Sequence, residues 1–119
     1  MKPVVYFAAI VALSLAIAPP SANAHSKKES TEPPDGAVLE TSPLAISMRF
    51  DMPMRVTLIS LTDQDGAAHN VLRSDNMQPV TEFSAEPPVL PEGLYKVEWR
   101  GLATDGHPMQ GTFSFEVSD

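Results

Sequence analysis

The feature that most constrains this chain is a strict two-residue alternation of apolar and polar side chains near its C-terminal end. Tyr95, Val97 and Trp99 alternate with charged residues, and residues 111–117 alternate in the same way. Because successive side chains of a strand point to opposite faces of a sheet, this pattern predicts two strands that each bury one face. Only a short loop separates them, so we expect the two strands to form a hairpin.

The rest of the chain repeats this alternation in shorter segments, and no stretch after the first 24 residues shows helical periodicity over three turns. The expected strands cover residues 44–50 and 55–62, which Asp51-Met52-Pro53 separates, and shorter stretches around Val71 and over 80–83. About seven short strands, with turn signals between them, predict an all-β fold, a small antiparallel β-sandwich of immunoglobulin-like size.

The polar composition of the first residues after position 24 predicts an element at the edge of the fold and not in its core. Residues 25–32 are polar throughout, which indicates an extended arm or an edge strand. Pro33-Pro34-Asp35-Gly36 then predicts a turn, because proline fixes φ and glycine tolerates positive φ.

Residues 1–24 have the composition of a secretory signal peptide. Lys2 gives a positive start, Val4 to Ala18 is almost wholly apolar, and Ala22-Asn23-Ala24 supplies a small-x-small cleavage pattern. The apolar run is shorter than the roughly 18 residues expected of a spanning helix. We therefore expect cleavage after Ala24, a domain over residues 25–119, and no membrane insertion after cleavage. A retained N-terminal anchor is the alternative, and it would leave no free amine at His25.

Charge and cysteine content exclude several classes of function. The full chain has 8 Lys and Arg against 15 Asp and Glu, a net charge of −7, and loss of Lys2 with the leader makes the balance more negative. Such a charge argues against nucleic acid and anionic lipids as partners. The chain has no cysteine. Disulfides, thiolate zinc sites and blue-copper centres are therefore excluded.

Asp105 and His107 form the candidate centre of function, in the loop of the predicted hairpin. Two positions apart, their side chains are expected to leave an extended backbone on the same side. The third partner that we expect is His25, the first residue after cleavage. A free N-terminal histidine offers both its amine and its ring Nδ1 to one metal ion. Three nitrogens and one oxygen suit square-planar or tetragonal Cu(II) better than other common metals.

Three motifs resemble those of one known family, the CopC-like periplasmic copper-binding proteins of copper resistance. Residues 90–100, LPEGLYKVEWR, are very similar to the family's LPAGxYxVxWR signature. Residues 103–115 are similar to its SxDGHPxxGxFxF ending. His25, followed by Pro33-Pro34-Asp35-Gly36-Ala37, resembles the family's N-terminal histidine and PADGA-type turn. The resemblance covers nearly all of residues 25–119.

This resemblance implies a Greek-key β-sandwich or barrel, a periplasmic location, and one Cu(II) ion held by His25, Asp105 and His107. The family's frequent association with an inner-membrane copper permease of the CopD type implies such a partner. Binding for sequestration, transport or resistance needs no turnover, and no nucleophile stands in a catalytic motif, so we expect no enzyme. The alternatives are a copper-dependent oxidase that uses the histidine chelate, and a metal-free β-sandwich partner of a membrane protein.

The sequence departs from the family's pattern in its methionines, which are the candidate Cu(I) ligands, and at one position where the family has an acidic residue. Some members carry a Met-rich loop for Cu(I), whereas residues 69–77 here offer one histidine and one methionine, which implies a Cu(II)-only type. His69 is interpreted as a solvated loop residue, and Met48 as core. Whether Met52, Met54, Met77 or Met109 binds Cu(I) is left open. Met52 stands where the family has an acidic residue, and Asp51 lies one place earlier. A one-residue shift in a strand reverses the side-chain face, which argues against an outer-shell role for Asp51.

Overall fold

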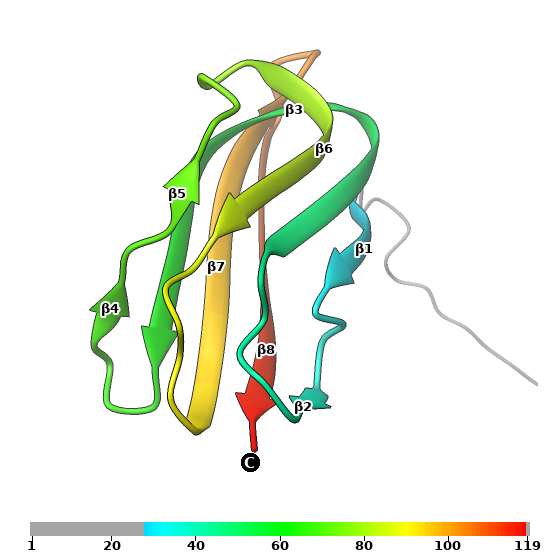
Figure 1. Ribbon diagram of the computed structural model, residues 1–119. Coiled ribbons are helices and arrows are strands. Elements are labelled where there is room, and N and C mark those ends of the chain that lie inside the picture. Colours follow the sequence, from blue (N-terminus) through cyan, green and yellow to red (C-terminus); the bar gives the residue numbers. More distant parts are fainter. Residues whose placement is uncertain (1–27, 119) are drawn as a thin grey trace, which may run out of the picture.

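The computed structural model describes residues 28–118, and every regular element in that range is a β-strand (Figure 1). The strands are β1 (Lys28–Glu32), β2 (Ala37–Leu39), β3 (Ile46–Asp63), β4 (Ala68–His69), β5 (Leu72–Arg73), β6 (Pro79–Glu86), β7 (Gly93–Ala103) and β8 (Pro108–Val117). This confirms the predicted all-β class. Within the same range, the chain has no helix with the length and apolarity that a membrane span requires.

β3 gives the fold its two layers, because it runs through both of them (Figure 1). Its first half pairs with β1 and most of β6, whereas its second half pairs with β7 and β4. The register with β6 shifts between Arg49 and Met54, where the strand bends. The prediction of two strands separated by Asp51-Met52-Pro53 was wrong, since those residues are part of β3. Pro53 has no backbone N–H for a neighbouring strand, and a bend accommodates that loss.

The predicted C-terminal hairpin is confirmed as β7 and β8, which pair in an unbroken antiparallel register from Gly93–Val117 to Leu102–Pro108. Tyr95, Val97 and Trp99 are buried and the residues between them are exposed, as the alternation predicts. This ladder makes the hairpin a rigid support for the loop at its end.

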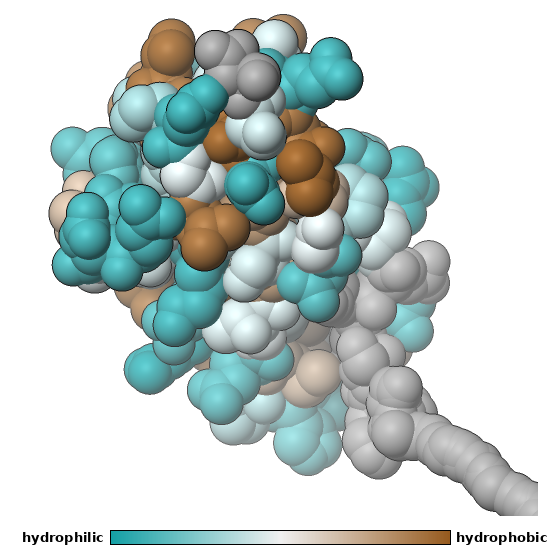
Figure 2. All heavy atoms as spheres, turned by 90° about the horizontal axis from the view of Figure 1, so that it is seen from below, coloured by the Kyte–Doolittle hydropathy of each residue, from teal (hydrophilic) through white to brown (hydrophobic). Residues whose placement is uncertain are grey.

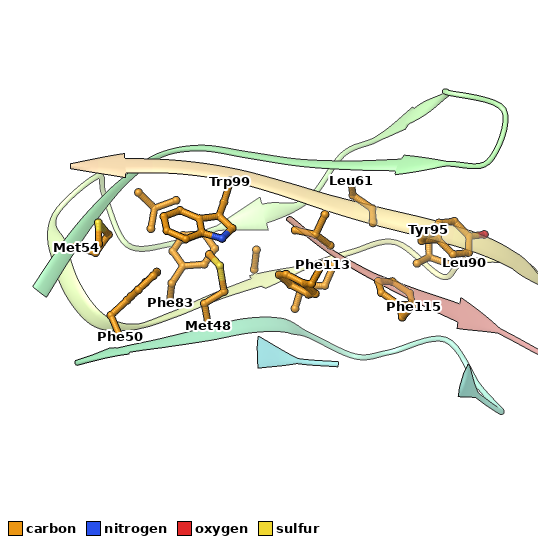
Figure 3. Packing of buried hydrophobic residues seen from close by; sticks show 14 of the residues in the cluster. Met48, Phe50, Met54, Leu61, Phe83, Leu90, Tyr95, Trp99, Phe113 and Phe115 are labelled. Atoms are coloured by element: carbon orange, nitrogen blue, oxygen red, sulfur yellow. The ribbon is translucent and has the colours of Figure 1, made fainter. Parts of the chain in front are cut away.

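The core lies between the two layers and is built from inward-facing residues of β3, β6, β7 and β8 (Figure 3). The largest fully buried side chains are Trp99, Phe83, Phe113, Ile46, Met48, Met54, Leu61, Val56 and Val97. Met48 is thus a core residue, as predicted. Phe50 packs edge-on against Trp99 with ring centroids 5.3 Å apart. Gly111 makes room for the indole, because a Cβ there would approach Trp99 Nε1 to 2.7 Å.

The N-terminal segment is an edge element, as predicted. β1 pairs antiparallel with β3, with a register shift between Lys28 and Ser30. The following turn is fastened to β8, since the Ser114 N–H donates to Asp35 Oδ1 at 2.9 Å and the Gly36 N–H donates to the Ser114 carbonyl at 2.7 Å. The chain then enters β2, which runs parallel to β8 and corrects the expectation of antiparallel pairing throughout.

The segment between β3 and β7 differs most from its prediction. In place of one strand around Val71, two short strands, β4 and β5, lie on either side of it. β4 pairs with β3 and β5 pairs with β6, so the chain crosses from one layer to the other at Asn70 and Val71. β6 covers residues 79–86 and extends beyond the expected 80–83 at both ends.

Candidate metal centre

The loop between β7 and β8 presents two of the three predicted ligands at one end of the sandwich (Figure 1). The Ala103 N–H donates to the His107 carbonyl and the Gly106 N–H donates to the Ala103 carbonyl, each at 2.9 Å. Gly106 has a φ of +90°, a conformation that residues with a Cβ rarely adopt. Residues 104–107, which we call the tip, are therefore a closed turn on a rigid ladder.

Asp105 and His107 are in contact at the tip, as expected, although the backbone between them is a closed turn and not the extended loop on which that expectation was based. His107 Nδ1 lies 2.8 Å from Asp105 Oδ2, and the His107 backbone N–H donates to Asp105 Oδ1 at 3.1 Å. Both side chains face solvent, with exposed fractions of 75% for His107 and 58% for Asp105. An imidazole and a carboxylate thus meet on an open surface, where an ion can reach them without any opening of the core.

The electrostatics of the tip favour a cation. The hydrogen bond from the His107 ring is the largest cause that holds the pKa of Asp105 below its ordinary value, and the His107 backbone N–H adds to it. Asp105 is therefore a carboxylate at neutral pH. Because Nδ1 is engaged with Asp105, Nε2 is the His107 nitrogen that a metal can reach without breaking this contact. Asp105 can act from outside the metal shell in this arrangement, or as a ligand once the pair opens.

The third predicted ligand, His25, lies outside the described residues, so its place in the site stays a prediction. Among residues 28–118, no group of three His, Cys, Asp or Glu side chains is arranged to hold a metal ion. β1 begins in the half of the molecule that carries the tip (Figure 1). Lys28 pairs with Phe50, and Met54, just beyond the bend, pairs with Ala103 at the foot of the tip. Three residues, the separation of His25 from Lys28, span at most about 10 Å.

A second histidine–aspartate pair lies at the opposite end of the sandwich, and sequence reasoning missed it. His69 Nε2 lies 3.0 Å from Asp63 Oδ2, and Asp63 Oδ1 accepts the N–H groups of Asp65 and Ala67. The His69 ring packs edge-on to Tyr95 at 5.8 Å. The two side chains are only 24% and 22% exposed, so His69 is less solvated than expected. The pair closes the turn between β3 and β4. The signal in the sequence was an Asp at the start of a turn and a His just after it.

This second pair also affects its neighbours. The His69 hydrogen bond is the largest cause that lowers the pKa of Asp63. Burial raises the pKa of Tyr95, and the nearby negative charge of Asp63 raises it further. The Tyr95 hydroxyl donates to the Pro91 carbonyl at 2.5 Å. His69, Asp63 and Tyr95 thus each have a hydrogen-bond partner within the protein, and we interpret the cluster as a support for the turn.

Side-chain contacts that the sequence analysis did not anticipate hold the loop before β6. The Arg73 guanidinium makes two 2.8 Å hydrogen bonds to Asp75 and lies over the Phe83 ring, 5.1 Å from its centroid. Arg55 donates to the Met77 carbonyl at 2.8 Å. These contacts support Asn76 and Met77, which both have positive φ. The Arg-x-Asp spacing of residues 73–75 was the available signal.

The methionines left open as Cu(I) ligands differ in accessibility. Met54 is fully buried in the core, so a metal could reach its sulfur only after local opening. Met52 and Met109 are half-buried, and Met109 packs against the core. Met77 is 43% exposed, and its sulfur lies 3.7 Å from the Arg73 guanidinium. A cation beside that sulfur disfavours a second one.

Comparison with known proteins assigns the family. Residues 28–118 match the CopC domain. The chain belongs to the CopC family. It is 30% identical over 106 residues to copper resistance protein C of Pseudomonas syringae pv. tomato, with 81% of this chain and 82% of that protein covered. Membership confirms the expectation of no enzyme, since CopC-family proteins are copper-binding resistance proteins.

The fold comparison agrees with the family assignment. The crystal structure of CopC from Methylosinus trichosporium OB3b superposes with a TM-score of 0.67 at 26% identity, covering 79% of this chain and 94% of that one. The predicted β-sandwich is confirmed by this likeness.

One relative is much longer. The copper transport protein CutJ of Bacillus subtilis is 24% identical over 114 residues, which cover 91% of this chain. The matched part is only 21% of CutJ, so this chain spans about a fifth of that protein.

Proposed function

We propose that this protein binds one Cu(II) ion in the periplasm, for sequestration, transport or resistance. The metal is held by the amine and Nδ1 of His25, by His107, and by Asp105 either directly or through its hydrogen bond to His107. The observation that carries the proposal is the exposed 2.8 Å contact between Asp105 and His107 in a chain of the CopC family. An open imidazole–carboxylate pair on a rigid turn is suited to capture and release of an ion.

The donor set favours Cu(II) over its competitors. Neutral nitrogen ligands with one carboxylate oxygen match the tetragonal preference of Cu(II), which also heads the general affinity order of divalent first-row metals. The chain has no cysteine, so no thiolate draws the site toward zinc or Cu(I). The Asp105 carboxylate supplies a negative charge, and the neutral amine and imidazoles supply lone pairs, so the donors can hold a divalent ion at an exposed position.

The same donors set the pH range of binding. The terminal amine has an ordinary pKa of about 7.7–8 and a histidine ring one of about 6.5, and both must be deprotonated to bind. Asp105 stays ionised well below that range, because its pKa is lowered. Copper affinity therefore falls with acidity as the nitrogens protonate, and copper is released below about pH 5.

The decisive experiment compares two preparations of the protein, one that begins at His25 and one with an additional N-terminal methionine. Each is titrated with Cu(II) against a competing chelator and examined by EPR. We expect tight binding and a nitrogen-rich tetragonal spectrum for the first preparation, and at least a tenfold weaker affinity for the second. Equal affinity would remove the terminal amine from the site. A His107→Ala variant of the first preparation then tests the tip separately.

Location and partner follow from the same proposal. Residues 1–24 direct export and are removed, which creates the free amine at His25. CutJ, in which the segment that matches this chain is part of a longer copper transport protein, supports an inner-membrane copper permease of the CopD type as the partner. Mass spectrometry of the protein isolated from the periplasm tests this step, because retention of residues 1–24 would leave no amine at His25.

A further inference from the structure

The sandwich has an apolar groove on the outer face of one layer, at the end opposite the tip. Val38 of β2 is paired with Glu116 of β8, which is paired with Leu94 of β7. Paired residues of neighbouring strands present their side chains on the same face, so these three form one row across the layer. They are among the eleven residues that line a groove of about 360 Å³.

The row has an unusual composition for an exposed surface. Val38 is 64% exposed and Leu94 is 53% exposed, so two aliphatic side chains flank one carboxylate. Within residues 28–118, no lysine or arginine nitrogen lies within 4.0 Å of the Glu116 carboxylate. Figure 2 views the molecule from this end and shows apolar side chains among hydrophilic ones. The row offers an anchor for a cation and two walls for an alkyl chain.

A lysine or arginine side chain fits this arrangement. Its methylene stem can pack between Val38 and Leu94 while its charged group reaches Glu116, since long cationic side chains cover apolar surface with their stems. Asp63 and Gln64 also line the groove, and Lys96 is the one basic residue among its lining residues. The charge of the groove therefore complements a basic partner.

The same charges disfavour two other occupants. A second copy of this chain would bring two carboxylates, Glu116 and Asp63, and only one base, Lys96, from each molecule against the same set of the other. The two faces would thus carry the same net charge, and like charges at an interface are repulsive. An anionic lipid surface would be repelled in the same way. A protein segment with basic and apolar side chains is the occupant that remains.

We propose that the Val38–Glu116–Leu94 row is a docking surface for a basic, apolar-flanked extramembrane segment of a copper transport membrane protein. The identity of this partner rests on the proposed function and on the likeness to part of CutJ. The row lies at the end of the sandwich away from the tip. Docking therefore leaves Asp105 and His107 exposed for transfer of the ion.

Site-specific photo-crosslinking in cells of the producing organism tests the proposal. A photoreactive amino acid replaces Leu94, and the crosslinked species are identified by mass spectrometry. The matched control places it at Leu72, which is 70% exposed and is paired with Glu86 on the other layer. We expect adducts at position 94 with a basic extramembrane segment of a membrane protein, and at least a tenfold lower yield at position 72. Glu116→Lys should abolish the adduct, whereas Glu86→Lys should preserve it.

Several outcomes overturn the proposal. These are adducts at position 94 only with a second copy of the chain, adducts only with lipid, equal yields at positions 72 and 94, and no adduct at all. Copper titration of the purified Glu116→Lys protein separates this inference from the proposed function. Unchanged Cu(II) affinity together with a lost adduct supports docking, whereas unchanged affinity with an unchanged adduct removes Glu116 from it and leaves the metal site standing.

Discussion

Residues 28–118 contain two histidine–aspartate pairs at opposite ends of the sandwich, with nearly the same contact distance but very different solvent exposure. His107 and Asp105 are 2.8 Å apart on the open tip, where their side chains are 75% and 58% exposed. His69 and Asp63 are 3.0 Å apart, with side chains 24% and 22% exposed. Proximity of an imidazole to a carboxylate therefore does not by itself mark a metal site, and the surroundings of each pair decide its role.

The difference lies in how many other partners each carboxylate has. Asp63 accepts two backbone N–H groups in addition to its histidine, so its bonding capacity is largely used within the turn between β3 and β4. Asp105 accepts one backbone N–H, from His107 itself. Tyr95 covers the His69 ring from one side. The His69–Asp63 pair thus stabilises the turn between β3 and β4. The His107–Asp105 pair is positioned by the tip and stays accessible to an ion.

The largest expected effect is the difference in Cu(II) affinity between proteins that lack one or the other of the two histidines. Loss of an outer-shell partner alone usually lowers metal affinity 10–100-fold, so His107→Ala should weaken Cu(II) binding by roughly 100-fold or more. His69→Ala should leave the affinity within about threefold of the unaltered protein, a change of well under 1 kcal/mol. Chelator competition at pH 7.5 measures both. A comparable loss in His69→Ala would contradict the division of roles between the two pairs.

The next effect tests Asp105. Asn in its place keeps the shape of the side chain but removes the charge that favours a cation, so Asp105→Asn should weaken Cu(II) binding by about 10–100-fold. Asp63→Asn is the matched control and should leave the affinity unchanged. EPR of the Asp105→Asn protein then distinguishes the two arrangements of the site. A changed set of directly bound atoms identifies Asp105 as a ligand, and an unchanged set indicates that it acts through His107. Unchanged affinity would exclude Asp105 from the site.

The sequence predicted the hairpin and the tip better than the rest of the fold, for a physical reason. Alternation over β7 and β8 reflects burial of one face, and the spacing of Asp105 and His107 fixes their relative direction within one turn. The bend of β3 at Asp51-Met52-Pro53 depends on which neighbours each half of the strand meets, which local pattern does not encode. The His69–Asp63 contact was missed because it depends on how the turn between β3 and β4 closes. The place of His25 is likewise a matter of tertiary structure.

A smaller effect concerns stability. Asp63→Ala removes the acceptor of two backbone N–H groups as well as the partner of His69, so thermal unfolding should occur a few degrees lower. Asp105→Ala should lower the melting temperature by clearly less, because its partners are open to water, which can replace the lost bonds. Calorimetry of the metal-free proteins measures the two shifts. A larger shift in Asp105→Ala would mean that the tip contributes more to the stability of the fold than the turn between β3 and β4 does.

The smallest expected effect is the pH dependence of the stability that the Asp63 carboxylate contributes. The pKa of Asp63 is lower in the folded protein than its ordinary value, chiefly through the His69 hydrogen bond. Its contribution to stability is therefore complete above its unfolded pKa of about 3.9 and is lost as the pH falls through the lower, folded value. The gap in melting temperature between the unaltered protein and Asp63→Asn should be constant from pH 7 to 5 and should close below about pH 4. At the proposed copper site, release by nitrogen protonation should be complete at a higher pH. Acidification should therefore empty the tip before it weakens the turn between β3 and β4. A gap that closes between pH 7 and 5 would contradict the assignment of the effect to the Asp63 carboxylate.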